Sequence, residues 1–196
     1  MNIFFRIGLF SLFCCGITAC NNNKPTNTSS TKVAADTAQF YPIAGFISDE
    51  MKYVDLRNFT IVEKISKGKD TSSREISKDD FLSSAAEILL QAQWFMANKY
   101  LFSESLFQDL GTESYTINYS STNASIKSIN LLLNQQTNLP KRLFIRVIEQ
   151  SGDTAITKQY SWVANKQFVI SSSKRTENGF NETSTKEISW KNQAQQ

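Results

Sequence analysis

The residues that could carry chemistry in this chain are mainly carboxylates, hydroxyls and aromatic rings. Histidine is absent, which removes the commonest general base and the commonest transition-metal ligand. The only cysteines are Cys14, Cys15 and Cys20, so the chain beyond residue 20 has no disulfide, no thiolate nucleophile and no cysteine-based metal site. The sequence therefore predicts no catalytic residue, no metal site and no cofactor.

Carboxylates offer the best remaining route to catalysis, through an acid–base pair of the glycosidase kind. The candidates are Asp79, Asp80, Asp109 and Glu113. Asp79 and Asp80 follow Ser77 at the start of a predicted helix, where acidic residues are favoured by the helix dipole. We interpret these two as capping residues, and a hydrolase that uses carboxylates alone is the alternative function.

Aromatic side chains could line a binding surface, because their faces give a large contact area at small entropic cost. The tryptophans and three of the tyrosines that could do so are Trp94, Trp162, Trp190, Tyr115, Tyr119 and Tyr160. We predict a surface for an apolar or sugar-like ligand at Trp162, Tyr160 and Trp190. The alternative is that these rings pack in the core, since strands are rich in aromatic residues by propensity alone.

The N-terminal segment MNIFFRIGLFSLFCCGITAC has one positive charge at Arg6, an apolar run from Ile7 to Ile17, and small residues before Cys20. This order is typical of a secretory signal. The apolar run is shorter than the ~20 residues of a bilayer-spanning helix, which favours a cleaved signal over a permanent anchor. We predict a signal peptide at residues 1–19.

The end of this segment resembles the lipobox of bacterial lipoproteins, in which a branched apolar residue and two small residues precede a cysteine that receives diacylglycerol. The matching residues are Ile17, Thr18, Ala19 and Cys20. The resemblance implies that the signal peptidase recognises Ile17, Thr18 and Ala19 and that Cys20 is lipidated. Cys14 and Cys15 lack the small preceding residue that the peptidase of this family accepts.

A lipid on Cys20 would make the membrane the first partner of the chain. Each buried methylene contributes about 0.8 kcal/mol, and two or more acyl chains hold a protein stably. Residues 20–39 are rich in Asn, Thr and Ser, a composition typical of a flexible tether. Asn21 differs from the Asp that retains lipoproteins in the inner membrane of the best-known sorting systems, so the resemblance favours the periplasmic face of an outer membrane.

Residues 40–196 are close to the commonest size of one domain. Their basic residues are scattered along the chain rather than concentrated, whereas nucleic-acid binders usually gather such charge on one face. We therefore expect a single domain that does not bind nucleic acid.

The apolar pattern predicts the elements of this domain. Ser48 and the acidic residues after it predict a helix at about 49–57, and residues 59–76 predict a hairpin. Ser77 and Asp80 form a capping-box pattern that opens a helix reaching about Gln93, while residues 94–111 fit either a helical or an irregular segment. From Glu113 onward, alternation of apolar and polar residues predicts six strands with short connections.

These elements predict an α+β fold in which N-terminal helices and a hairpin precede a six-strand antiparallel meander packed on the helices. Alternation along the strands predicts one apolar face under the helices and one partly polar, open face. We predict a non-enzymatic, lipid-anchored cell-envelope protein that binds an unknown protein partner or an apolar ligand on the sheet. A structural component of an envelope complex is a further alternative.

Overall fold

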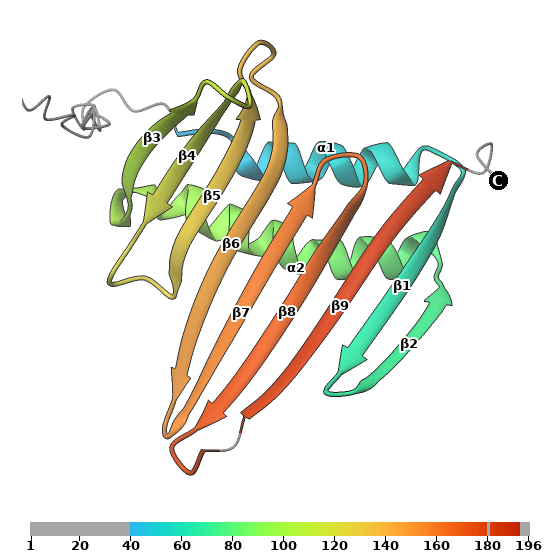
Figure 1. Ribbon diagram of the computed structural model, residues 1–196, viewed down its shortest axis with the longest axis vertical. Helices are drawn as coiled ribbons and strands as arrows, with labels where there is room; N and C mark the ends of the chain where they lie inside the picture. Colours follow the sequence, from blue (N-terminus) through green and yellow to red (C-terminus); the bar gives the residue numbers. More distant parts are fainter. Residues whose placement is uncertain (1–39, 180, 193–196) are drawn as a thin grey trace, which may run out of the picture.

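Two helices cover one face of a nine-stranded antiparallel sheet in the computed structural model, which describes residues 40–179 and 181–192 (Figure 1). In chain order the elements are α1 (Ile43–Asp55), β1 (Phe59–Lys67), β2 (Asp70–Glu75), α2 (Lys78–Ala97), a 3₁₀ turn (Lys99–Leu101), β3 (Ser103–Asp109), β4 (Ser114–Ser120), β5 (Ile126–Asn134), β6 (Pro140–Ser151), β7 (Thr154–Val163), β8 (Gln167–Thr176) and β9 (Asn181–Asn192). The predicted signal peptide, lipobox and tether lie outside the described residues. Within those residues, no helix is both long and apolar enough to cross a membrane.

The sheet has the order β2-β1-β9-β8-β7-β6-β5-β4-β3. From β3 to β9 each strand pairs with its successor, while the β1–β2 hairpin joins the far side because β1 pairs with β9. Helix α2 connects β2 at one edge to β3 at the other (Figure 1). Its 20 residues correspond to a length of about 30 Å, which suits this crossing.

The core lies between the helices and the facing side of the sheet. Leu143, Ile145 and Val147 of β6 are buried there, as the alternation along this strand predicts. Phe81 and Phe95 of α2 are fully buried against the same layer. The prediction of one helix-covered face is therefore confirmed.

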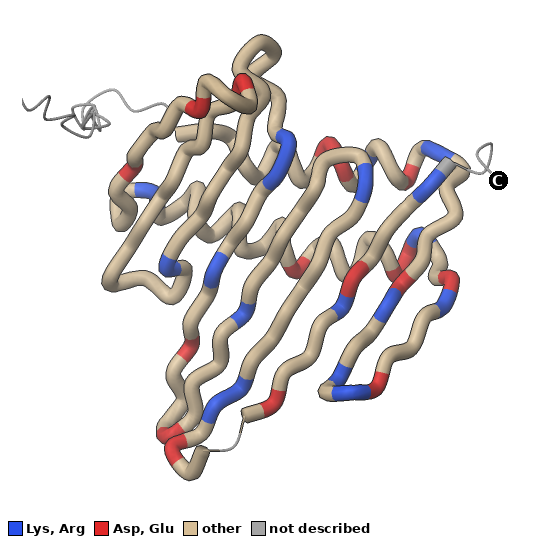
Figure 2. The backbone as a smooth tube through the Cα atoms, in the orientation of Figure 1, with Lys and Arg blue, Asp and Glu red and all other residues tan. Residues whose placement is uncertain are grey.

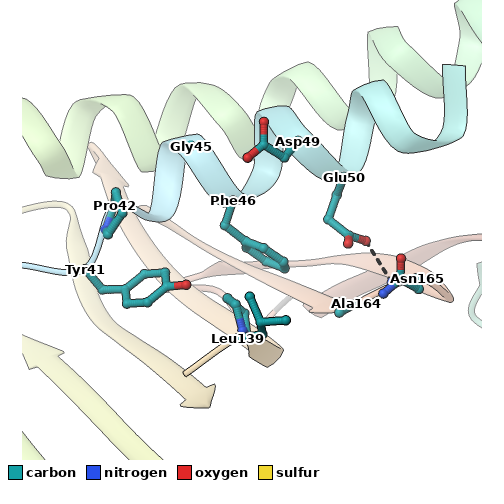
Figure 3. Close-up of a pocket in the computed structure, with 10 residues that line it drawn as sticks. Tyr41, Pro42, Gly45, Phe46, Asp49, Glu50, Leu139, Ala164 and Asn165 are labelled. Carbon is teal, nitrogen blue, oxygen red and sulfur yellow. Dashed lines mark hydrogen bonds between the residues drawn. The ribbon is translucent and has the colours of Figure 1, made fainter. Parts of the chain in front are cut away.

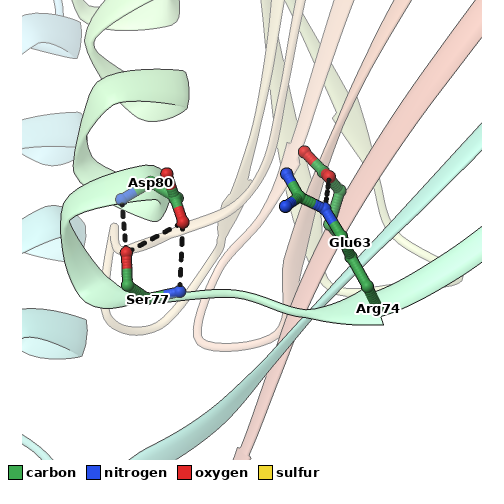
Figure 4. A network of polar contacts seen from close by, with 4 residues as sticks. All are labelled: Glu63, Arg74, Ser77 and Asp80. Carbon is green, nitrogen blue, oxygen red and sulfur yellow. Dashed lines mark hydrogen bonds and ion pairs between the residues drawn. The ribbon is translucent and has the colours of Figure 1, made fainter.

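The start of α2 has the capping box that the sequence predicts. The backbone N–H of Asp80 donates to Ser77 Oγ at 3.1 Å, and the backbone N–H of Ser77 donates to Asp80 Oδ2 at 3.3 Å (Figure 4). The helix ends at Ala97, beyond the predicted end at Gln93, because Phe95 continues its buried stripe.

The predicted start of the first helix is wrong. Helix α1 begins at Ile43 after Pro42, so Ser48 lies inside the helix rather than at its N-cap. The physical reason is the apolar spacing of Ile43, Ile47 and Val54, which all lie fully buried on one side of α1. Tertiary packing thus outweighs the local capping signal at Ser48.

The predicted number of strands is also too low. The six predicted strands are β4 to β9, and the predicted hairpin is β1–β2, but both belong to one sheet of nine strands. The additional strand, β3, lies in the segment whose structure the sequence pattern leaves open. Its alternation is weak because polar Glu104 and Gln108 share the helix side with Leu106.

Candidate functional site

The face of the sheet opposite the helices carries mostly hydroxyl and amide side chains on β7, β8 and β9. Gln159 and Ser161 of β7 alternate with the buried residues of that strand, and Ser171 of β8 lies opposite Gln159. Figure 2 shows basic and acidic residues interspersed along the strands and turns. The open face also holds apolar residues, since Phe144 and Val169 lie opposite Ser161 on the two neighbouring strands.

The three rings predicted as a ligand surface lie on the other, helix-covered face. Trp162, Tyr160 and Trp190 are 0%, 1% and 4% exposed. Trp162 stacks on Phe168 with ring centroids 4.9 Å apart, and Trp190 meets Phe81 of α2 edge-on at 5.4 Å. Their positions correct the prediction: the rings form the core, which was the alternative role, because the alternation of β7 and β9 directs them toward the helices.

Polar atoms of two of these rings bond to carboxylates of the helices. Tyr160 donates its hydroxyl hydrogen to Glu87 Oε1 of α2 at 2.9 Å, and Lys158 Nζ lies 3.0 Å from the same oxygen. Burial, with the adjacent Glu87 charge, raises the pKa of Tyr160 well above its ordinary value. Trp162 donates its indole N–H to Glu50 Oε2 of α1 at 3.2 Å, so a carboxylate helps to hold each helix on the sheet.

A cavity of about 320 Å³ lies beside the first turns of α1 (Figure 3). The turn between β5 and β6 and the turn between β7 and β8 form its other sides. Its apolar lining includes Tyr41, Phe46, Leu139 and Pro140. The volume is at the lower end of the range for small-molecule sites, which are usually concave and mostly apolar.

Glu50 is the buried charged residue of this cavity. Its Oε2 accepts both the Trp162 indole N–H and the backbone N–H of Asn165, the latter at 2.8 Å (Figure 3). Asn165 has a φ of 56°, a left-handed conformation that Asn tolerates better than most residues. The carboxylate therefore joins α1 to the turn that closes the cavity.

Tyr41 places a hydroxyl at the opposite side of the cavity from Glu50. This hydroxyl lies 3.5 Å from the backbone carbonyl of Asn138, to which it donates. Burial raises the pKa of Tyr41, so the hydroxyl stays protonated at neutral pH. The cavity thus combines apolar walls with a neutral hydroxyl, the hydrogen-bonded carboxylate of Glu50 and the exposed carboxylate of Asp49.

Two of the carboxylates considered for catalysis serve a local turn and a helix cap. Of the other two, Asp79 lies in the first turn of α2, and Glu113 accepts a hydrogen bond from Gln136 Nε2 at 3.2 Å. Asp109 accepts hydrogen bonds from Thr112 Oγ1 and Gly111 N, which lower its pKa, and hydrogen bonds from Ser77 lower the pKa of Asp80. A glycosidase acid needs the opposite shift, a raised pKa. No group of three or more potential metal ligands occurs within residues 40–179 and 181–192.

No family model, curated protein or solved structure matches this chain. The functional argument therefore depends on the geometry of the cavity and the sheet.

The cavity residues Phe46, Leu139 and Asn165 are not among the sites that the sequence indicates. Each comes from a different segment, and only the fold brings the three together. Glu50 is visible in the sequence only as an acidic residue near a predicted helix start. No motif links it to Trp162, which is 112 positions away.

Proposed function

We propose that this chain is a lipid-anchored protein of the cell envelope whose α+β domain binds a partner or an apolar ligand without catalysing a reaction. The anchor is the lipid on Cys20, and the location is the periplasmic face of an outer membrane. The anchor follows from the resemblance of residues 17–20 to a lipobox, and the location follows from Asn21, which differs from the Asp that retains lipoproteins in the inner membrane of the best-known sorting systems. The domain then works at the membrane surface, at the end of the tether formed by residues 20–39.

The cavity beside α1 is the observation that carries the binding proposal. Phe46, Leu139 and Pro140 provide apolar contact, and the hydroxyl of Tyr41 can orient a polar end of the ligand. Glu50 is already engaged in two hydrogen bonds, which favours a structural role over proton transfer. The proposed ligand site is thus this cavity and not the rings of the sheet, and it holds a small apolar group.

Leu139→Asp is expected to weaken binding of an apolar probe to the cavity about tenfold, equivalent to about 1.4 kcal/mol. Leu139 is 63% exposed, so the added charge lies at the cavity wall without disturbing the core. The measurement is a fluorescence titration of the full chain with N-phenylnaphthylamine. Leu56→Asp is the matched control, because Leu56 is 81% exposed and does not line the cavity. Equal affinity of the two variants would rule out the cavity as the probe site.

Cys20→Ala is expected to abolish acylation and release the chain from the membrane fraction, because no other cysteine has the small preceding residue of a lipobox. The measurement is mass spectrometry of the chain extracted from bacterial membranes, with the wild-type chain as the control. A Cys20→Ala chain that is still acylated and membrane-bound would overturn the anchor. This result is independent of the probe titration, so the two parts of the proposal can fail separately.

A further inference from the structure

The open face of the sheet carries two arginines that pair with no carboxylate in the part of the chain that the structure describes. Arg142 and Arg146 of β6 are both exposed, and they alternate with Leu143 and Ile145, which face the helices. Figure 2 shows two basic stretches along β6 with no acidic residue between them. Four residues of a strand span about 13 Å, so the two arginines form a spaced pair along one strand.

The residues beside this pair on the open face are uncharged. Those of the adjoining strands β5 and β7 are Leu132, Asn130, Ser128, Val163, Ser161 and Gln159. The next strands outward, β4 and β8, add no charged side chain in the same rows. The first acidic residue in these rows toward β9 is Glu187, and it lies opposite Lys64 of β1. The centre of the open face is therefore locally basic.

An aromatic ring and neutral polar groups lie between the two arginines. Phe144 is half-buried at the midpoint of the pair, and the register places Asn130 on one side of it and Ser161 on the other. An aromatic face offers a large apolar contact area, while amide and hydroxyl groups both donate and accept hydrogen bonds. This combination suits a sugar ring, which has apolar C–H groups on its faces and hydroxyl groups around its rim.

The strands under this surface are closed to backbone pairing. β5, β6 and β7 each have a hydrogen-bonded neighbour on both sides. An extended peptide therefore cannot join the sheet here as an added strand, which is the mode in which peptides bind a sheet through their main chain. Recognition at this surface depends on side chains alone, which favours a polysaccharide over an acidic peptide.

We propose that the surface formed by Arg142, Phe144 and Arg146, together with Asn130 and Ser161, binds a carboxylated polysaccharide. The charge of the partner follows from complementarity, because two unpaired guanidinium groups attract carboxylates and can bind each of them through two parallel hydrogen bonds. A polymer lying along β6 places carboxylates on the two arginines and a sugar ring on Phe144. This inference depends on neither the lipid anchor nor the cavity.

A chain carrying both Arg142→Gln and Arg146→Gln is expected to bind polygalacturonate about tenfold more weakly than the wild-type chain, because two exposed charge contacts are lost. The measurement is biolayer interferometry of the full chain in detergent solution on the immobilised polymer. The matched control carries Lys67→Gln and Lys69→Gln, which remove the same charge from two exposed positions at the β1–β2 turn. Its dissociation constant should equal that of the wild-type chain, and circular dichroism verifies that both variants are folded.

Two further polymers test the class of partner. Dextran has the sugar rings without the carboxylates, and poly-glutamate has the carboxylates without the sugar rings, so both are expected to bind more weakly than polygalacturonate. Equal weakening by the arginine and lysine substitutions would show attraction to net charge alone and would overturn the proposal. Failure of the wild-type chain to bind polygalacturonate would do the same. Tighter binding of poly-glutamate would assign the surface to an acidic peptide instead.

Discussion

Trp162→Ala is expected to lower the free energy of unfolding by about 3–5 kcal/mol, as truncation of a large buried aromatic side chain usually does. Trp162 is fully buried, stacks on Phe168, and lies 6.0 Å from the ring of Trp190. Its removal leaves a cavity at the centre of the core and leaves Glu50 without one of its hydrogen-bond donors. The measurement is urea denaturation followed by far-ultraviolet circular dichroism.

Trp162→Phe separates the packing of the ring from its hydrogen bond. Phenylalanine fills much of the same volume but has no N–H group for Glu50, so we expect a smaller loss of about 1–3 kcal/mol. A loss below about 1 kcal/mol for Trp162→Ala would show that the ring contributes little to the core. That result would return Trp162 to consideration as part of a ligand surface.

Secondary-structure elements whose signal lies within a few consecutive residues could be predicted from the sequence. The capping box of Ser77 and Asp80 is a local pattern, and the structure contains it. The six strands from β4 to β9 follow from alternation and short polar turns, which are also local signals. Burial of every second residue then confirms which side of β6 faces the helices.

Long-range pairing could not be predicted in the same way. Nothing in the local pattern of β1 indicates that Ile61 lies beside Trp190, although this pairing joins the ends of the described chain into one sheet. The edge strand β3 was equally difficult, because an edge strand with one neighbour needs less regular alternation of apolar residues than a central strand. Exposed Leu106 and Phe107 therefore carry no clear strand signal in the sequence.

The candidate site was harder to predict than the fold. Alternation shows that Tyr160 and Trp162 share one face of β7, but it cannot tell a core face from a ligand face until the helices are placed. The cavity depends on the approach of α1 to two turns, so no single segment contains its pattern. A motif predicts a functional residue only at Cys20, which lies outside the described part of the chain, so this prediction stays untested.

Glu50→Ala is expected to lower the free energy of unfolding by about 2–4 kcal/mol, because two donors lose the carboxylate that satisfies them. The donors are the indole N–H of Trp162 and the backbone N–H of Asn165, both bonded to Glu50 Oε2. The first is buried with the core, and the second belongs to the turn beside the cavity. Urea denaturation gives the stability change, and titration with N-phenylnaphthylamine gives the effect on the cavity.

Glu50→Gln keeps one oxygen acceptor of the same reach but removes the charge, so it tests whether Glu50 acts as a hydrogen-bond acceptor or as an ionised group. For an acceptor that only positions the helix and the turn, we expect a loss of about 1 kcal/mol and nearly unchanged probe affinity. A glutamine variant as unstable as the alanine variant would contradict that role. Loss of probe binding by Glu50→Gln without loss of stability would instead show that the charge contacts the ligand.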